Sequence, residues 1–300
     1  GHENSEAFGG DPGRVTIGGE SAGAFSVTNM LAMSTTDGLF HRAIAQSGAA
    51  HHTFDPDDGR EIAGNFLNQL GGPSADDLMS MDVKQILEAA EKVSEESGQQ
   101  TGRSQEPFYP VWGHEALPDD PRDLIASGAG SDVTLLTGTN EDEMALWGVS
   151  AMDADQAAEM VARITDDPDA LVDVYRRRLD DATPGWVACA IASDLVFGIP
   201  AIRHAEYRSA HGADTWMYRF SWDSRAFDGL FGAAHALEIP FTFNTLDRAG
   251  VDMFIGEGEV PHGLAGFFWA GWGSPETSKR PDLSGSSNFC LLYTSPSPRD

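Results

Sequence analysis

Val15-Thr16-Ile17-Gly18-Gly19-Glu20-Ser21-Ala22-Gly23 is the stretch that decides the fold. Its β-branched run, Val15-Thr16-Ile17, predicts a short strand. The segment from Ala24 to Met33 has apolar residues at helical spacing and predicts a helix. The glycines between them favour a sharp strand-to-helix turn with Ser21 at its tip. A serine placed in this way within a G-x-S-x-G pattern is typical of the nucleophile elbow of a serine hydrolase with an α/β-hydrolase fold.

The G-x-S-x-G pattern alone is weak evidence, because a chain this rich in glycine and serine yields about 0.3 chance matches. Its context strengthens it, since the turn is expected to lift the Ser21 hydroxyl out of the sheet. The Ala22 N–H would then lie at the helix N-terminus and point toward a developing oxyanion. The alternative is a glycine-rich turn with a capping serine.

A serine nucleophile needs a base, and the base needs an orienting carboxylate. Among nine histidines, His235 stands apart because it follows the last predicted strand and precedes an apolar run. Asp142 and Glu143 directly follow another predicted strand, and the carboxyl ends of parallel strands gather catalytic groups. The order serine, acid, histidine is that of α/β-hydrolases. Spacing alone does not choose between Asp142 and Glu143, and a loop histidine is often structural.

Strands and helices alternate along the chain, which predicts an α/β fold with a mostly parallel sheet and helices on both faces. Gly71-Gly72-Pro73 is expected to end one helix, and Asp82 to cap the next. The other predicted elements are a strand at 43–45, helices between 60 and 96, a strand at 133–136, helices over 153–210 broken near Pro168, Pro184 and Pro200, and a last clear strand at 216–220.

Composition excludes several function classes. With 19 Lys and Arg against 47 Asp and Glu, the net charge of −28 argues against binding nucleic acid or anionic membranes. We find no apolar run as long as a membrane span. Cys189 lies in an apolar segment and is expected to be a buried, inert thiol, and two cysteines form neither a disulfide framework nor a zinc site.

Four blocks of the chain resemble one family, the type B carboxylesterases, which contain bacterial para-nitrobenzyl esterases and cholinesterases. The resemblance implies the α/β-hydrolase fold, ester hydrolysis without metal or organic cofactor, and Glu143 as the triad acid, with Asp142 its structural neighbour. The localisation is left open, and a cytoplasmic location is the expectation for a bacterial enzyme without disulfides. The blocks are the elbow block (7–12, 15–17 and 19–23), the next block (39–48), the acid block (138–143) and the histidine block (235–241).

The chain departs from this family at both ends. The family carries a long N-terminal portion with a glycine-rich oxyanion loop, and nothing upstream of Ser21 resembles it. Ala22 is therefore the one oxyanion donor that we assign. We expect the catalytic two-thirds of a larger, N-terminally incomplete fold, poorly soluble in isolation, over residues 1–285. Residues 286–300 resemble translated adapter sequence and are set aside as a non-native or disordered tail.

The predicted reaction is acyl transfer through a Ser21, His235 and Glu143 triad on a neutral, largely apolar small-molecule ester. Hydrolysis of another acyl bond, such as an amide, carbamate or thioester, stays open, as do an impaired catalyst and a non-catalytic cholinesterase-like binding protein. The oligomeric state is left open. Aromatic residues that are candidates for lining a substrate pocket, or for packing between loops, are Phe108, Tyr109, Trp112, Trp147 and Phe231.

Overall fold

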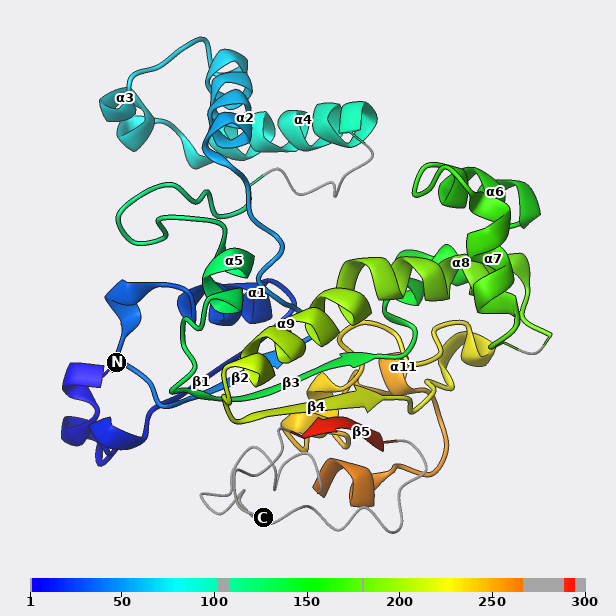
Figure 1. Ribbon diagram of the computed structural model, residues 1–300. Coiled ribbons are helices and arrows are strands. Elements are labelled where there is room, and N and C mark those ends of the chain that lie inside the picture. Colours follow the sequence, from blue (N-terminus) through cyan, green and yellow to red (C-terminus); the bar gives the residue numbers. More distant parts are fainter. Residues whose placement is uncertain (1, 102–107, 180, 267–288, 295–300) are drawn as a thin grey trace.

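A five-stranded sheet forms the centre of the molecule in the computed structural model, which describes residues 2–101, 108–179, 181–266 and 289–294 (Figure 1). The strands lie in the order β1-β2-β3-β4-β5. The first four are parallel, and β5 pairs antiparallel with β4. Their bounds are β1 Thr16–Glu20, β2 Arg42–Gln46, β3 Thr134–Asn140, β4 Thr215–Phe220 and β5 Phe289–Thr294.

Helices connect the parallel strands, as the alternation in the sequence predicts. Their bounds are α1 Ala22–Met30, α2 Pro56–Gln69, α3 Ala75–Ser80, α4 Val83–Thr101, α5 Pro121–Ala126, α6 Ala154–Ala162, α7 Pro168–Arg176, α8 Pro184–Ser193, α9 Ile199–Ala210, α10 Ile239–Thr242 and α11 Asp252–Ile255. A π-helical segment, Asp194–Gly198, joins α8 to α9, and Glu143–Trp147 forms a short 3₁₀ helix after β3.

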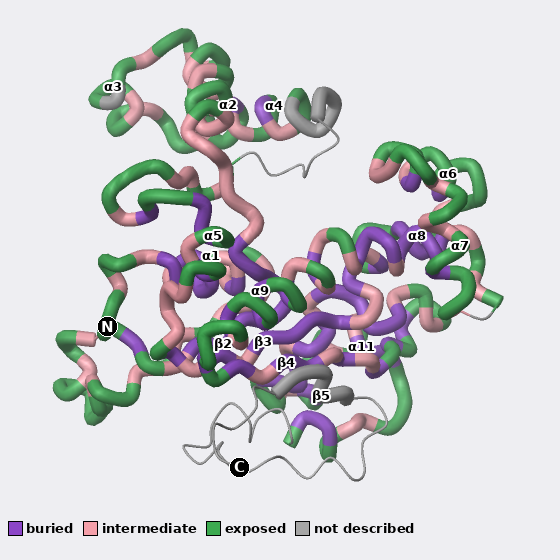
Figure 2. Tube along the Cα trace, in the orientation of Figure 1, coloured by how far each residue is buried: buried purple, intermediate pink, exposed green. Residues whose placement is uncertain are grey.

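Both faces of the sheet are covered, which confirms the predicted layering. The alternation along β4 shows it, because Met217 packs against Ala201 and Ala205 of α9, whereas Tyr218 packs with Leu237 on the opposite face. Helices α1 and α9 lie on one side of the sheet (Figure 1). On the other side, Phe241 of α10 and Ile255 of α11 join the cluster that contains Tyr218. Figure 2 shows that the buried residues concentrate in the sheet and the adjacent helices, while α2 and α3 lie outside this core.

Helix boundaries follow the capping residues in the sequence. Gly71-Gly72-Pro73 follows the end of α2, and the Asp82 carboxylate accepts from the Lys84 N–H, so both of those predictions are confirmed. Pro168 and Pro184 each occupy the first helical position, capped by Asp167 and Thr183, and so they begin helices.

The break predicted near Pro200 is wrong, because helix runs from Pro184 to Ala210 through the π segment. A π turn directly before Ile199-Pro200 makes room for a residue that has no N–H and would crowd a regular turn. By length and composition, these 27 residues are long and apolar enough to cross a membrane. The expectation that no apolar run is as long as a membrane span is therefore also wrong. Most of the run is buried in the protein, as in a core helix.

Residues 216–220 are not the last strand, because β5 follows within the segment 286–300 that was set aside. β5 pairs with the edge of β4, from Trp216 opposite Thr294 to Phe220 opposite Phe289. The run Phe289-Cys290-Leu291-Leu292-Tyr293 has high strand propensity, and β4 otherwise presents unpaired backbone groups at this edge. Residues 286–288 and 295–300 of the predicted tail lie outside the described residues.

Candidate active site

Ser21 lies at the turn between β1 and α1, as predicted, with φ 53° and ψ −119°. Non-glycine residues rarely adopt such a conformation, so the surrounding structure must hold it. The Ser21 N–H donates to the Gln46 carbonyl at 2.9 Å, which fixes the turn to β2, and its carbonyl accepts from Phe25 of α1. Gly19 allows β1 and α1 to pack closely, because a Cβ at this position would lie 2.3 Å from the carbonyl carbon of Gly23.

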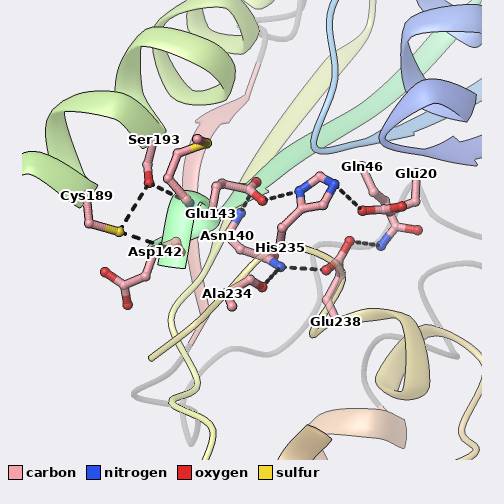
Figure 3. Close-up of polar contacts among 11 residues, drawn as sticks. Glu20, Gln46, Asn140, Asp142, Glu143, Cys189, Ser193, Ala234, His235 and Glu238 are labelled. Atoms are coloured by element: carbon pink, nitrogen blue, oxygen red, sulfur yellow. Dashed lines mark hydrogen bonds and ion pairs between the residues drawn. The ribbon is translucent and has the colours of Figure 1, made fainter. Parts of the chain in front are cut away.

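Glu143 and His235 meet in the interior, 92 positions apart in sequence. Glu143 Oε2 lies 2.6 Å from His235 Nδ1, and its other oxygen, Oε1, accepts from the Asn140 N–H at 2.8 Å (Figure 3). Both carboxylate oxygens therefore have hydrogen-bond partners, and the bond to Nδ1 leaves Nε2 as the reactive nitrogen. The two loops are also joined through the backbone, because the His235 N–H donates to the Glu143 carbonyl.

Asp142 has a different role. Its Oδ2 accepts from the Ala233 N–H at 3.0 Å, and its N–H donates to the Ala233 carbonyl. Burial raises the pKa of Asp142 to about 6. Asp142 thus ties the acid loop to the chain just before His235, and of the two candidate acids it is Glu143 that contacts the imidazole.

Two further carboxylates approach the histidine, and residue spacing did not reveal either. Glu20 Oε1 lies 3.1 Å from His235 Nε2, an ion-pair contact without hydrogen-bond alignment. Glu238 is fully buried, and it accepts from Asn140 Nδ2 at 2.6 Å and from Gln46 Nε2 at 3.3 Å (Figure 3). The available signals were positional: Glu20 directly precedes Ser21, and Glu238 lies one helical turn beyond His235.

The carboxylates control the protonation of the site. Burial lowers the pKa of His235, but the hydrogen bond and charge of Glu143, with the charge of Glu20, outweigh it and raise the pKa above 6.5. Burial raises the pKa of Glu20, although the His235 charge opposes this shift. Burial, together with the Glu143 charge, raises the pKa of Glu238 to about 8, so this side chain is protonated at neutral pH.

The structure does not bring Ser21 into hydrogen-bond contact with His235 among the described residues. His235 Nε2 instead points toward the elbow at Glu20, the neighbour of Ser21. Such contacts are often long in ligand-free enzymes and tighten with substrate. Ala22 is the first residue of α1, as predicted, and this places its N–H among the unbonded donors of that helix N-terminus.

Aromatic rings pack around the histidine. The Trp147 ring lies 5.0 Å from the His235 ring, and the Phe197 ring lies 4.8 Å from it. Phe197 also stacks on Phe25, which follows the elbow. Of the predicted pocket residues, only Trp147 has a described ring contact with His235. The others contact different groups. Phe108 packs with Phe66, Tyr109 with His52 and Phe54, and Phe231 with Phe227 and Phe254. Trp112 packs against the apolar cluster that includes Ala24 and Val27 of α1.

Cys189 is a buried free thiol, as predicted. Its Sγ lies 4.0 Å from the Asp142 carbonyl and 3.9 Å from Ser193 Oγ (Figure 3). Burial raises its pKa to about 12, so the thiol is not reactive at neutral pH. The side chain of Cys290 lies outside the described residues.

Comparisons with known proteins identify the family of this chain. The sequence model described as "Carboxylesterase family" matches residues 2–255. A para-nitrobenzyl esterase of Bacillus subtilis (strain 168) is 34% identical over 252 residues, covering 82% of this chain and 49% of the relative. A phenmedipham hydrolase of Pseudarthrobacter oxydans is 31% identical over 255 residues, covering 82% of this chain and 50% of the relative.

Solved structures show the same likeness. The Geobacillus stearothermophilus carboxylesterase at pH 6.2 superposes with a TM-score of 0.74 and 29% identity, over 90% of this chain and 56% of that one. This confirms the α/β-hydrolase fold. The chain spans about half the length of the curated relatives it matches, rather than the expected two-thirds. The chain belongs to the carboxylesterase family, in its type B group.

Proposed function

We propose that this chain provides the Ser-His-Glu triad of a serine carboxylesterase, with Ser21 as nucleophile, His235 as base and Glu143 as orienting acid. The observation that supports it most is the 2.6 Å contact between Glu143 and His235 in a buried site whose free nitrogen points to the elbow. The strained backbone conformation of Ser21 also supports the proposal, because such strain is common at the turn that positions a nucleophile.

The proposed reaction passes through an acyl-enzyme. Ser21 Oγ attacks the ester carbonyl carbon while His235 Nε2 takes its proton. The carbonyl oxygen becomes an oxyanion that the Ala22 N–H stabilises, and collapse expels the alcohol, which receives the proton from His235. Water then repeats these steps on the acyl-enzyme, which releases the acid. Glu143 keeps the proton of the neutral imidazole on Nδ1 and stabilises the imidazolium.

The proposed substrates are neutral, largely apolar esters. Trp147 and Phe197 place aromatic surface directly beside His235, which favours an apolar group next to the reacting carbonyl. The cluster of carboxylates and the net charge of −28 disfavour anionic substrates.

Hydrolysis of another acyl bond is the second candidate, and one relative bears the name phenmedipham hydrolase rather than that of an esterase. The test is a panel of para-nitrophenyl esters and the matching anilides on the product of the full-length gene, with Ser21→Ala as control. We expect the esters to be cleaved and the variant to be inactive. Preferential cleavage of anilides would favour an amidase, and equal rates for the variant would refute Ser21 as nucleophile.

A further inference from the structure

Asn140, the last residue of β3, contacts the acid loop through its backbone and the histidine loop through its side chain. Its N–H donates to Glu143 Oε1 at 2.8 Å. Its Nδ2 donates to the Ala234 carbonyl at 2.7 Å and to Glu238 Oε2 at 2.6 Å (Figure 3). Ala234 directly precedes His235, and Glu238 follows it closely. One buried side chain therefore holds the chain on both sides of the imidazole.

The orientation of the Asn140 amide favours the histidine loop. The Ala234 carbonyl can only accept a hydrogen bond, so it is the amide nitrogen of Asn140 that faces it. Both N–H groups of this nitrogen then serve the histidine loop, one on each side of His235. At the other end of the amide, Oδ1 is buried and has no hydrogen-bond partner among the described residues. Such an oxygen costs free energy, and the side chain keeps both donors on the histidine loop despite that cost.

The chain between these two contacts is strained and needs support. Ala236 has a φ of 65°, in the left-handed region that residues with a Cβ rarely adopt. Such a conformation persists where the surrounding structure imposes it. The bonds from Asn140 to Ala234 and to Glu238 lie on either side of Ala236. They therefore hold the strained turn that directly follows His235.

We propose that Asn140 is a positioning residue of the triad, which holds the His235 imidazole in line with the Glu143 carboxylate. This role rests on the proposed function, because the orientation of the ring affects the rate only if His235 is the base. Asp142 does not replace it, since Asp142 binds the chain at Ala233, upstream of the histidine. A misplacement of about 1 Å between catalytic groups can lower the rate about 10²-fold.

The experiment compares two variants of the full-length gene product, each with a buried polar side chain replaced by an apolar one of similar shape. Asn140→Leu removes both donors to the histidine loop. Thr242→Val is the matched control, because it removes one buried hydrogen bond, from Gln46 Nε2 to Thr242 Oγ1 at 3.0 Å, and leaves Asn140 unchanged. For a para-nitrophenyl ester we expect Asn140→Leu to lower kcat about 10²-fold with little change in KM. Thr242→Val should keep a kcat close to that of the wild type.

The pH profile separates positioning from a loss of stability. Burial lowers the pKa of His235, and the hydrogen bond and charge of Glu143 outweigh it. A looser contact weakens both effects of Glu143, so the apparent pKa of kcat/KM should fall in Asn140→Leu and stay unchanged in Thr242→Val. Glu20 and Glu238, the other acids near the ring, are present in both variants. Lower stability alone leaves this apparent pKa unchanged.

Ser21→Ala distinguishes failure of the positioning role from failure of the proposed function. Equal kcat and equal apparent pKa in Asn140→Leu and Thr242→Val, with Ser21→Ala inactive, would overturn the positioning role and leave the triad in place. An active Ser21→Ala would refute the proposed function itself. If Asn140→Leu does not fold, Asn140→Ser, which keeps one hydroxyl donor, should show the same changes to a smaller extent. If neither variant folds, Asn140 builds the core, and its role in positioning is overturned.

Discussion

Glu143 Oε2 lies 2.6 Å from His235 Nδ1, and the same carboxylate is anchored through Oε1 by the Asn140 N–H. The acid thus holds the imidazole from the end of β3, while the backbone bond from His235 to the Glu143 carbonyl fixes the distance between their loops. An orienting acid needs this combination of a fixed carboxylate and a fixed tautomer.

Replacing Glu143 by Gln should lower kcat for a para-nitrophenyl ester by about 10⁴-fold, because the amide no longer fixes the productive tautomer or stabilises the imidazolium. Asp142→Asn is the matched control, since Asp142 contacts Ala233 rather than the imidazole. The assay uses the full-length gene product. A large loss in Asp142→Asn with a small one in Glu143→Gln would reverse the assignment.

The pH dependence of kcat/KM should report the raised pKa of His235. The base is the neutral imidazole, so activity should fall as pH decreases through an apparent pKa above 6.5. Glu20→Gln removes a negative charge near Nε2 and should move that apparent pKa downward, while Asp142→Asn should leave it unchanged. A rate that stays flat to about pH 4 contradicts a histidine base. An upward shift in Glu20→Gln would contradict the effect of the Glu20 charge on His235.

Glu238 should make the protein less stable as pH rises. Its folded-state pKa of about 8 lies above the ordinary value of 4.5, so its stabilising contribution is complete below about pH 4.5 and is lost as pH rises toward about 8. Glu238→Gln stays neutral, and its melting temperature should fall less between about pH 5 and pH 8 than that of the wild type. Calorimetry at both values tests this, and parallel declines in the two proteins would contradict it.

Gly19→Ala and Gly23→Ala form a matched pair at the elbow. A Cβ on Gly19 would overlap the backbone of α1, whereas one on Gly23 meets nothing within 4 Å. Gly19→Ala should therefore lower the free energy of unfolding by about 1–3 kcal/mol. Gly23→Ala, inside α1, should be neutral or stabilising by up to about 1 kcal/mol. Urea denaturation measures both, and the reverse order would contradict this account of the elbow.

Removing residues 286–300 tests the proposal that the domain occupies residues 1–285. The family match ends at residue 255, and β5 adds only an antiparallel edge to β4. We expect an unchanged Tm, although more aggregation can follow because the deletion exposes the edge of β4. A fall of more than about 3 °C, which corresponds to about 1 kcal/mol, would make β5 part of the folded domain.

The sequence predicted those features that depend on local pattern. The β-branched run before Ser21 predicted β1, and the helical spacing after it predicted α1. The acid and histidine blocks predicted Glu143 and His235, which contact each other in the structure. The continuous helix through Pro200 was missed, because a π turn relieves a clash that proline normally causes.

Contacts that arise only from tertiary packing were not predicted. In the sequence, Glu20 and Glu238 look like ordinary acidic residues. Only the folded structure shows that Glu20 lies beside His235 and that Glu238 lies beside Asn140. Phe197 lies in an apolar run without any sign that it packs on His235. The segment of β5 has high strand propensity, but its pairing partner, the edge of β4, is set by the sheet and not by local sequence.

The most direct test of the proposed triad is mass spectrometry of the protein after treatment with a fluorophosphonate, followed by peptide mapping. The account predicts one adduct per chain on Ser21, absent in Ser21→Ala and formed much more slowly in His235→Ala, because Ser21 then lacks its base. An adduct on a different serine, or no adduct on a folded wild-type chain, would contradict it.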